Sequence, residues 1–433
     1  MKLPVITTDR AIVDAVQGAV QALHHTNGES GRELVFEPLS IDNAEQAIEY
    51  INYEMPQLVM LSFSDACLDG FDVMARIVAD PWLNNAGIVA VYNDSATGER
   101  INGLENTNIL YSLRIAEIPA QLPKVLAVIR RNSQILFHRA IQKDLISDIT
   151  GEFVLDLDLL IIPLYANLIA NYLFNIGFVD HARRHHVSLI LTEMLANAIE
   201  HGNCAISYHE KGSHLETGEP MQRLVEQKAQ DPAIAARKVY FSYEIHHSHS
   251  RYVIRDEGQG FDWRQYVDPD REIDFLASHG RGIWMTLKQA AKVEFNEPGN
   301  QVAIEFAHNL NTSNVLPSAF KGNQIIVVEP EQVIFRQGEE SDYLYVVADG
   351  EYRVEIDGQR VATVTPADLL MGEMSFLLQD VRSATVIANT PGRLITISQQ
   401  SFVDSIKHQP YYGLFIAKLL AQRLLRSNRN IID

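Results

Sequence analysis

Apolar and polar positions alternate in a regular way along the first part of the chain. Short apolar runs such as "LPVITT", "QLVMLSF" and "GIVAVYN" predict buried strands, and helical patterns such as "GFDVMARIVAD" lie between them. Alternating strands and helices are typical of a doubly wound α/β domain with a parallel sheet. We expect such a domain over residues 1–130, followed by a polar helical linker over 131–149.

A second pattern covers residues 150–308, where long helical stretches come first and strands such as "KVYFSYEI" follow. The most apolar run of the chain, "LDLLIIPLYANLIANYLF", is interrupted by Pro163. Asn167, Asn171 and Asn175 recur along one helical face of this segment. Because a bilayer would bury those amides at high cost, we expect an amphipathic helix inside a soluble domain and no membrane span.

The last part of the chain changes pattern again. Residues 309–324 are rich in Asn, Ser, Pro and Gly, which predicts a linker. Short strands at regular spacing over 325–433 predict a small β-roll with flanking helices, so the whole chain is expected to be multidomain. The final helical pattern has an apolar face that fits either a homodimer or packing on its own β-roll (Leu414, Ala417, Leu420 and Leu424).

Charge and cysteine content narrow the classes of partner. The 433 residues carry a formal net charge of −19, which repels phosphate backbones and anionic lipid and disfavours direct nucleic-acid or membrane binding. A local pocket can still take a small anion. The two cysteines lie far apart and no signal peptide is evident, so we expect a cytoplasmic protein. Histidine-rich pieces such as "EIHHSHS" lack metal-ligand spacing and are interpreted as solvated.

The helical stretch "LTEMLANAIEHGN" carries a stripe of polar side chains. Glu193, Asn197, Glu200 and His201 fall on one helical face. Buried carboxylates and amides need partners, which are either neighbouring protein groups or a bound metal–phosphate group. This helix alone favours protein partners.

Glycine motifs downstream favour the metal–phosphate alternative. "DEGQGFDW" follows a strand and contains Asp256, Gly258 and Gly260, and "SHGRGIWMTLKQA" places Gly280 and Gly282 at the head of a helix. Glycines there let a phosphate approach backbone N–H groups. An aspartate at a strand end can accept the amino hydrogen of adenine. The residues between the glycine pairs are numerous enough for a mobile lid.

In this order, the three motifs resemble the ATPase domain shared by gyrase, Hsp90, histidine kinases and bacterial anti-sigma-factor serine kinases, the last most closely. The resemblance implies an α/β sandwich of the Bergerat type with ATP between helices and sheet. It implies that Asn197 coordinates Mg²⁺, that Glu193 is the catalytic base, and that Asp256 reads adenine. It also implies that Gly258 and Gly260 hinge a lid. The second pair, Gly280 and Gly282, would contact phosphate.

The same resemblance implies a serine/threonine protein kinase that acts on an anti-anti-sigma (antagonist) protein, or a partner of a sigma factor. The alternative is a non-catalytic ATP-binding protein that sequesters its partner. Residues 204–238 form an insert relative to the smallest members of this branch, and we expect it to cover or reshape the partner surface.

The first domain resembles response-regulator receivers around "PQLVMLSFSDACLDGFDVMARI". Ser62 stands where the phosphate-accepting aspartate is expected. The acidic pair aligns near Thr7 and Thr8, which leaves Asp9 alone, and Lys2 is the sole lysine of residues 1–123. Without these groups little would hold Mg²⁺. We therefore expect a degenerate receiver that serves docking or dimerisation, with any flavodoxin-like domain as the alternative.

The C-terminal region resembles cyclic-nucleotide-binding domains through "MGEMSFLLQDVRSATVIA". The resemblance implies that Gly372 and Glu373 bind the ribose hydroxyl and that Arg382 pairs with the cyclic phosphate of cAMP or cGMP. Ser383 and Ala384 would add contacts. The alternative is a β-roll that docks protein. No helix-turn-helix follows it, so direct DNA contact is disfavoured.

Overall fold

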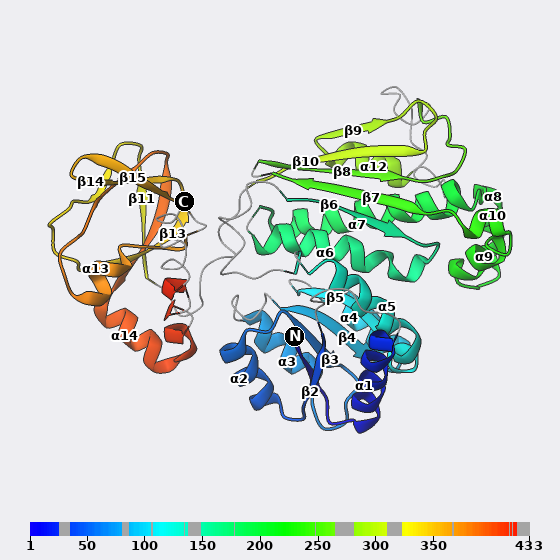
Figure 1. Cartoon of the computed structure of the whole chain (residues 1–433), viewed down its shortest axis with the longest axis horizontal. Coiled ribbons are helices and arrows are strands. Elements are labelled where there is room, and N and C mark those ends of the chain that lie inside the picture. The colour runs from blue at the N-terminus through cyan, green and yellow to red at the C-terminus, as the bar shows by residue number, and fades with distance from the viewer. Residues whose placement is uncertain are drawn as a thin grey trace. The chain divides into compact units, whose positions relative to one another are not determined.

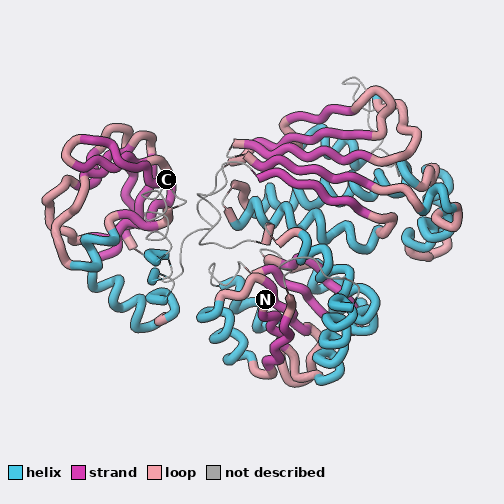
Figure 2. Tube along the Cα trace, viewed as in Figure 1, coloured by secondary structure: helices cyan, strands magenta, loops and turns pink. Residues whose placement is uncertain are grey.

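The computed structural model describes residues 1–25, 35–79, 86–104, 107–133, 135–136, 149–176, 178–246, 248–264, 281–309, 323–365, 368–414, 416–417 and 419–421. Most of the two predicted linkers, and Gly280, lie outside these residues. Four sheets are present among them (Figures 1 and 2).

The N-terminal domain is a five-stranded parallel sheet with the order β2-β1-β3-β4-β5, as in doubly wound folds. Its strands are β1 (Lys2–Ile6), β2 (Glu37–Ile41), β3 (Leu58–Ser62), β4 (Gly87–Tyr92) and β5 (Ile109–Arg114). Its helices are α1 (Arg10–His25), α2 (Ala44–Glu54), α3 (Gly70–Ala79), α4 (Ser95–Asn102) and α5 (Ile118–Arg131). Every residue of β3 is buried, because helices cover both faces of the sheet (Figure 1).

The middle domain is an antiparallel sheet with the order β6-β7-β8-β10-β9 (Figure 2). The strands are β6 (Ile149–Leu155), β7 (Val239–Ile245), β8 (His249–Arg255), β9 (Lys292–Phe295) and β10 (Gln301–Ala307). The helices α6 (Ile162–Asn175), α7 (His181–Asn197) and α12 (Arg281–Gln289) accompany it, with α6 and α7 along one face (Figure 1). Burial alternates along β7, so one face of this strand packs into the core.

Helix α6 corrects one prediction, the amphipathic character of this segment. The apolar run is divided beside Pro163, because a short 3-10 turn (Leu159–Ile161) precedes α6 and Pro163 stands in the first turn of α6, where a missing N–H costs no helical hydrogen bond. Asn171 and Asn175 are buried, and Asn167 accepts a hydrogen bond from Ser188 Oγ at 2.6 Å. The amide face is thus not a water-facing side of an amphipathic helix. No helix among the described residues is long and apolar enough to cross a membrane.

The C-terminal domain consists of two four-stranded antiparallel sheets with the orders β11-β18-β13-β16 and β12-β17-β14-β15. The strands are β11 (Gln324–Val328), β12 (Val333–Phe335), β13 (Tyr343–Asp349), β14 (Tyr352–Ile356), β15 (Gln359–Val364), β16 (Leu370–Met371), β17 (Thr385–Ala388) and β18 (Gly392–Ser398). The helices are α13 (Glu373–Leu378) and α14 (Gln399–His408). Strand β13 sends Leu344 and Val346 into one apolar cluster and Val347 into another, which follows from its two-residue period.

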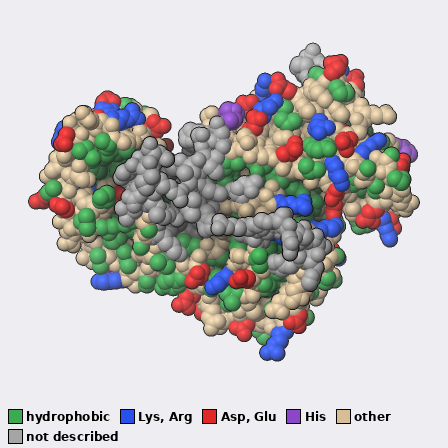
Figure 3. Space-filling view, in the orientation of Figure 1, with side chains coloured by type: hydrophobic (Ala, Val, Ile, Leu, Met, Phe, Trp, Pro, Cys, Tyr) green, Lys and Arg blue, Asp and Glu red, His purple; other side chains and the backbone are tan. Residues whose placement is uncertain are grey.

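The surface agrees with the acidic composition. On the face shown in Figure 3, Lys and Arg side chains are scattered among Asp and Glu rather than gathered in one patch. Both cysteines are free: Cys67 is exposed and Cys204 is buried.

Candidate nucleotide sites

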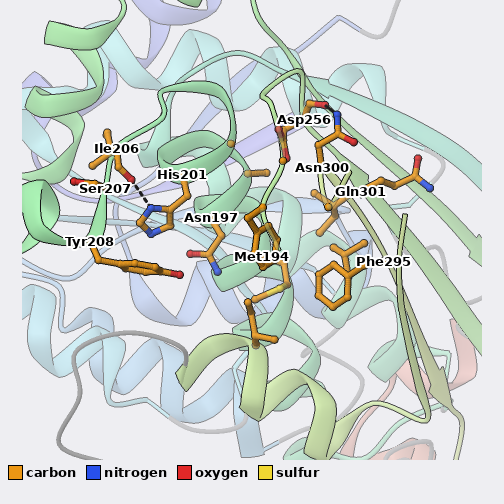
Figure 4. A pocket seen from close by; sticks show the side chains of 18 residues that line it. Met194, Asn197, His201, Ile206, Ser207, Tyr208, Asp256, Phe295, Asn300 and Gln301 are labelled. Carbon is orange, nitrogen blue, oxygen red and sulfur yellow. Dashed lines mark hydrogen bonds between the residues drawn. The ribbon is translucent and has the colours of Figure 1, made fainter. Parts of the chain in front are cut away.

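A cavity of about 370 Å³ lies in the middle domain between the end of α7 and the sheet, with one wall from the insert. Its size suits a small-molecule ligand. Asn197 and His201 come from the helix, Asp256 from the end of β8, and Asn300 from the start of β10 (Figure 4). Two of the three predicted motifs, those of Asn197 and Asp256, therefore meet around one cavity.

Asn197 stands on the helical wall of this cavity, one turn after Glu193. The Asn197 amide N–H donates to Glu193 Oε1 at 3.5 Å. With its N–H so directed, the amide oxygen of Asn197 is the atom that a hard cation would take. Glu193 itself is half-buried and is not among the residues that line the cavity.

A π-helical turn over Ala198–Asn203 continues α7 and changes the predicted stripe. A π-turn is wider than an α-turn, so the residues after Asn197 are rotated relative to an ideal α-helix. His201 stays on the cavity, whereas Glu200 is only 4% exposed and pairs with Lys211 Nζ at 2.5 Å. All four polar stripe residues thus have protein partners, as the helix alone had favoured: besides the Glu200–Lys211 and Asn197–Glu193 pairs, His201 Nδ1 lies 2.6 Å from the Ile206 carbonyl oxygen.

Asp256 ends β8 on the opposite side of the cavity from Tyr208 (Figure 4). Its side chain is 8% exposed, and Oδ1 accepts a hydrogen bond from the Gly258 N–H at 2.8 Å. Burial raises the pKa of this carboxyl to about 6, despite that hydrogen bond. Gly202 is essential to the arrangement, because a Cβ there would lie 2.4 Å from Asp256 Cγ.

The predicted glycines have different positions. Gly258 packs against the backbone of Gly202, and Gly260 lines the cavity with φ +80°. A Cβ on Gly260 would lie 1.9 Å from the Pro298 carbonyl oxygen, so only glycine fits. Gly282 lies in the first turn of α12, which contributes Ile283 to the cavity. Gly280 is outside the described residues.

Sequence reasoning missed two parts of the wall. Phe295, Asn300 and Gln301 line the cavity from β9, β10 and the turn between them, and Tyr208 lines it from the insert (Figure 4). The "EPGNQ" turn was a usable signal, because Gly299 has φ +78° and begins this wall. Nothing in the local pattern of the insert marks Tyr208.

The C-terminal domain brings its predicted residues together in a second site. Arg382 is 3% exposed, and its Nη1 donates to the Gly372 carbonyl at 2.9 Å and to Ser375 Oγ at 3.2 Å. Its Nη2 donates to the Tyr343 carbonyl at 2.5 Å. Gly372 has φ +75°, and a Cβ there would lie 2.3 Å from Arg382 Nη1. Glycine is therefore required beside the guanidinium.

Aromatic rings complete this second site and were not predicted. The Arg382 guanidinium carbon lies 4.2 Å from the centre of the Phe335 ring and 5.7 Å from that of Tyr345. Burial lowers the pKa of Arg382. Its Nε is buried with no hydrogen-bond partner among the described residues. Among the remaining predicted residues Glu373 and Ala384 are buried, whereas Ser383 is exposed.

Comparison with known families bears on both sites. Residues 165–306 match the histidine kinase-like ATPase domain family, and residues 325–409 match the cyclic nucleotide-binding domain family. The chain contains both domains.

Named relatives share only part of the chain. The cAMP-dependent protein kinase type II regulatory subunit of Drosophila melanogaster is 37% identical over 75 residues, 17% of this chain and 20% of that protein. The cyclic AMP receptor protein of Thermus thermophilus is 34% identical over 96 residues, 21% of this chain and 44% of that protein. The chain therefore spans less than half the length of these relatives. The crystal structure of Thermus thermophilus catabolite activator protein is 30% identical, with a TM-score of 0.24, and the match covers 26% of this chain and 55% of that one.

The donor set of the ATPase domain fits a magnesium ion that arrives with phosphate. The described residues contain no group of three or more His, Cys, Asp or Glu that could hold a metal alone. Mg²⁺ usually takes one or two protein oxygens and completes its shell with water and substrate phosphates. The amide oxygen of Asn197 meets that requirement.

The N-terminal domain has a different arrangement at the carboxyl edge of its sheet. Ser62 is 2% exposed, and its hydroxyl has no hydrogen-bond partner among the described residues. Asp65 accepts hydrogen bonds from Thr7 Oγ1 at 2.8 Å, Thr8 Oγ1 at 2.6 Å and the Cys67 N–H at 2.9 Å. Burial opposes ionisation of Asp65, but these bonds outweigh it and hold its pKa below the ordinary value. Sequence reasoning missed Asp65.

Proposed function

We propose that this chain is a bacterial signalling regulator whose ATPase domain is an anti-sigma-type serine/threonine protein kinase that uses Mg-ATP. We assign that domain to residues 150–308, the cyclic-nucleotide sensor to 325–433 and the degenerate receiver to 1–130. The observation that carries the proposal is the joining of Asn197 and Asp256 across one cavity.

Each side chain takes a separate part in the proposed reaction. Asp256, as a carboxylate, accepts the amino hydrogen of adenine, and the Asn197 oxygen holds the metal. The bound Mg²⁺ would supply charge neutralisation at the phosphates. Glu193 takes the proton from the acceptor hydroxyl of an antagonist protein. Gly260 allows backbone to approach where a side chain would collide.

The test uses the full chain with radiolabelled ATP, magnesium and the proteins that co-purify with it. Wild type should label a small antagonist protein, Asn197→Ala should bind ATP weakly, and Glu193→Ala should bind ATP without transfer. Intact transfer by Glu193→Ala would remove Glu193 as base.

A second candidate is favoured by the position of Glu193 outside the cavity lining. In this alternative the ATPase domain binds ATP and sequesters its partner, an antagonist protein or a sigma factor, without chemistry. ATP-dependent partner retention by both wild type and Glu193→Ala, with no labelled product, would support it.

For the C-terminal domain we propose cAMP or cGMP as effector. The Arg382 Nε–H is the support, since it is a buried donor without a protein partner among the described residues and suits a cyclic phosphate oxygen. Calorimetry with each nucleotide tests the proposal. No detectable heat with either would favour a protein-docking role.

For the N-terminal domain we propose docking or dimerisation without phosphorylation. The support is that Ser62 replaces the acceptor and that Asp65 is already bonded to Thr7 and Thr8. Incubation with acetyl phosphate should leave the mass of the protein unchanged, and a stable phosphoryl adduct would contradict this.

A further inference from the structure

The insert is anchored to the ATPase domain and is not a loose surface loop. It forms α8 (Tyr208–Glu216), α9 (Met221–Lys228) and α10 (Pro232–Ala235). Lys211 on α8 pairs with the buried Glu200 carboxylate, and Gln222 Oε1 on α9 accepts from the Leu159 N–H at 2.8 Å. Because breaking a buried ion pair leaves a charge without a partner, the Glu200–Lys211 pair fixes α8 beside the π-helical turn.

The end of the insert is tied to the same turn. Asn203 is fully buried, donates to the Lys238 carbonyl at 3.0 Å and accepts from the Glu257 N–H at 2.8 Å. Arg237 Nη1 donates to the Asn203 carbonyl at 2.5 Å. These bonds connect the insert to the residue that follows Asp256, so both ends of the insert are held at the cavity.

Tyr208 is a residue of the insert that lines the cavity. It is the first residue of α8, whose N-cap Ser207 accepts from the Glu210 N–H at 3.2 Å. The Tyr208 ring centre lies 4.5 Å from that of His201, and both residues line the cavity. In Figure 4 the Tyr208 hydroxyl is directed toward Asn197.

The charge of the cavity lining indicates which ligand group the Tyr208 hydroxyl could contact. None of the described residues that line the cavity is a lysine or an arginine. Among these residues a triphosphate held there would meet neutral donors besides its metal. A hydroxyl that donates to a charged oxygen makes one of the stronger hydrogen bonds in proteins.

We propose that Tyr208 is a phosphate-positioning residue: its hydroxyl donates to an oxygen of the nucleotide triphosphate on the Asn197 side of the cavity. This rests on the proposed ATP binding. The insert would then be part of the nucleotide site, in addition to any partner surface it forms.

Calorimetry on the full chain with magnesium tests the proposal, with ATP and adenosine as probes. Tyr208→Phe keeps the ring beside His201 and removes only the donor. It should weaken ATP binding about tenfold and leave adenosine binding unchanged. Leu215→Ala, an exposed change on the same helix outside the cavity, is the matched control and should alter neither affinity.

The outcomes separate the two proposals. Unchanged ATP affinity in Tyr208→Phe, with wild-type binding intact, overturns the role of Tyr208 alone. Equal losses for ATP and adenosine overturn the phosphate contact and place the Tyr208 hydroxyl at the adenosine part of the ligand. Absence of ATP binding by the folded wild type overturns both proposals.

Discussion

The two candidate nucleotide sites of this chain are built in different ways. In the ATPase domain, Asn197, His201 and Asp256 face a cavity of about 370 Å³ between helix and sheet. In the cyclic nucleotide-binding domain, the Arg382 guanidinium already donates to the carbonyls of Gly372 and Tyr343. The same side chain that would bind ligand therefore also holds its own domain together.

Ligand binding and folding are therefore expected to be more closely linked at the Arg382 site than at the Asn197 site. Removing a half-exposed polar group such as Asn197 should weaken ligand binding and leave the stability of the fold unchanged. Removing Arg382 leaves two carbonyls and two aromatic rings without their partner, so the fold should suffer as well.

The largest loss of ATP affinity is expected when a side chain is added inside the cavity that Asn197 and Asp256 line. Gly202→Ala places a Cβ 2.4 Å from Asp256 Cγ and should lower ATP affinity by about a hundredfold or more, since the clash displaces the carboxylate that we propose to read adenine. Gly212→Ala is the matched control, because its Cβ would meet nothing within 4 Å. Calorimetry on both variants checks this, and normal binding by Gly202→Ala would refute the position of Asp256.

The next largest effect concerns the fold of the β-roll. Arg382→Ala should destabilise the C-terminal domain by about 3 kcal/mol, because a buried guanidinium that donates to the Gly372 and Tyr343 carbonyls is lost. Asn197→Ala should change stability by less than about 0.5 kcal/mol. Denaturant unfolding of the full chain measures both. Equal stability of the two variants would remove the contrast between the sites.

The pH dependence of adenosine affinity tests the role of Asp256 in the ATPase domain. The raised pKa of Asp256, about 6 against 3.8, stabilises the folded protein below pH 3.8, and this contribution is lost as pH rises through 6. A ligand amino group prefers the carboxylate, so adenosine affinity should increase about tenfold between pH 5 and pH 7. Asp256→Asn should abolish this dependence in calorimetry. An unaltered pH profile would exclude Asp256 as the titrating group.

A further effect is expected outside both sites, on stability alone. Asp65→Asn weakens the bonds from Thr7 and Thr8 and should cost about 2 kcal/mol of N-terminal domain stability with ATP affinity unchanged. Because the Asp65 pKa is lowered, this stability is present above its ordinary pKa of 3.8 and is lost as pH falls below it. Asp14→Asn, on the exposed side of α1, is the control in thermal unfolding. Equal melting temperatures would contradict the role of Asp65.

Local periodicity was enough to predict much of the architecture. Apolar runs identified β3 and β4, and regular strand spacing identified the β-roll. The helix of Asn197 and the strand end at Asp256 followed from motifs whose spacing reflects local geometry. Those motifs meet at one cavity, as the resemblance implied.

Other features depend on packing between distant segments. The rotation of Glu200 toward Lys211 follows from a π-turn, and the burial of Asn171 follows from how α6 packs. The bonds of Asp65 to Thr7 join residues far apart in the chain. Neither the periodicity nor the composition of the sequence predicts such contacts between distant residues.

Periodicity and motifs alone predicted the helices and strands and the two domains that match known families, because helical and strand periods record local burial. Packing in three dimensions determines which polar groups already have protein partners and brings Tyr208 of the insert to the cavity that Asn197 lines. The reason is physical: hydrogen-bond partners and cavity walls are set by the packing of segments that are remote in sequence.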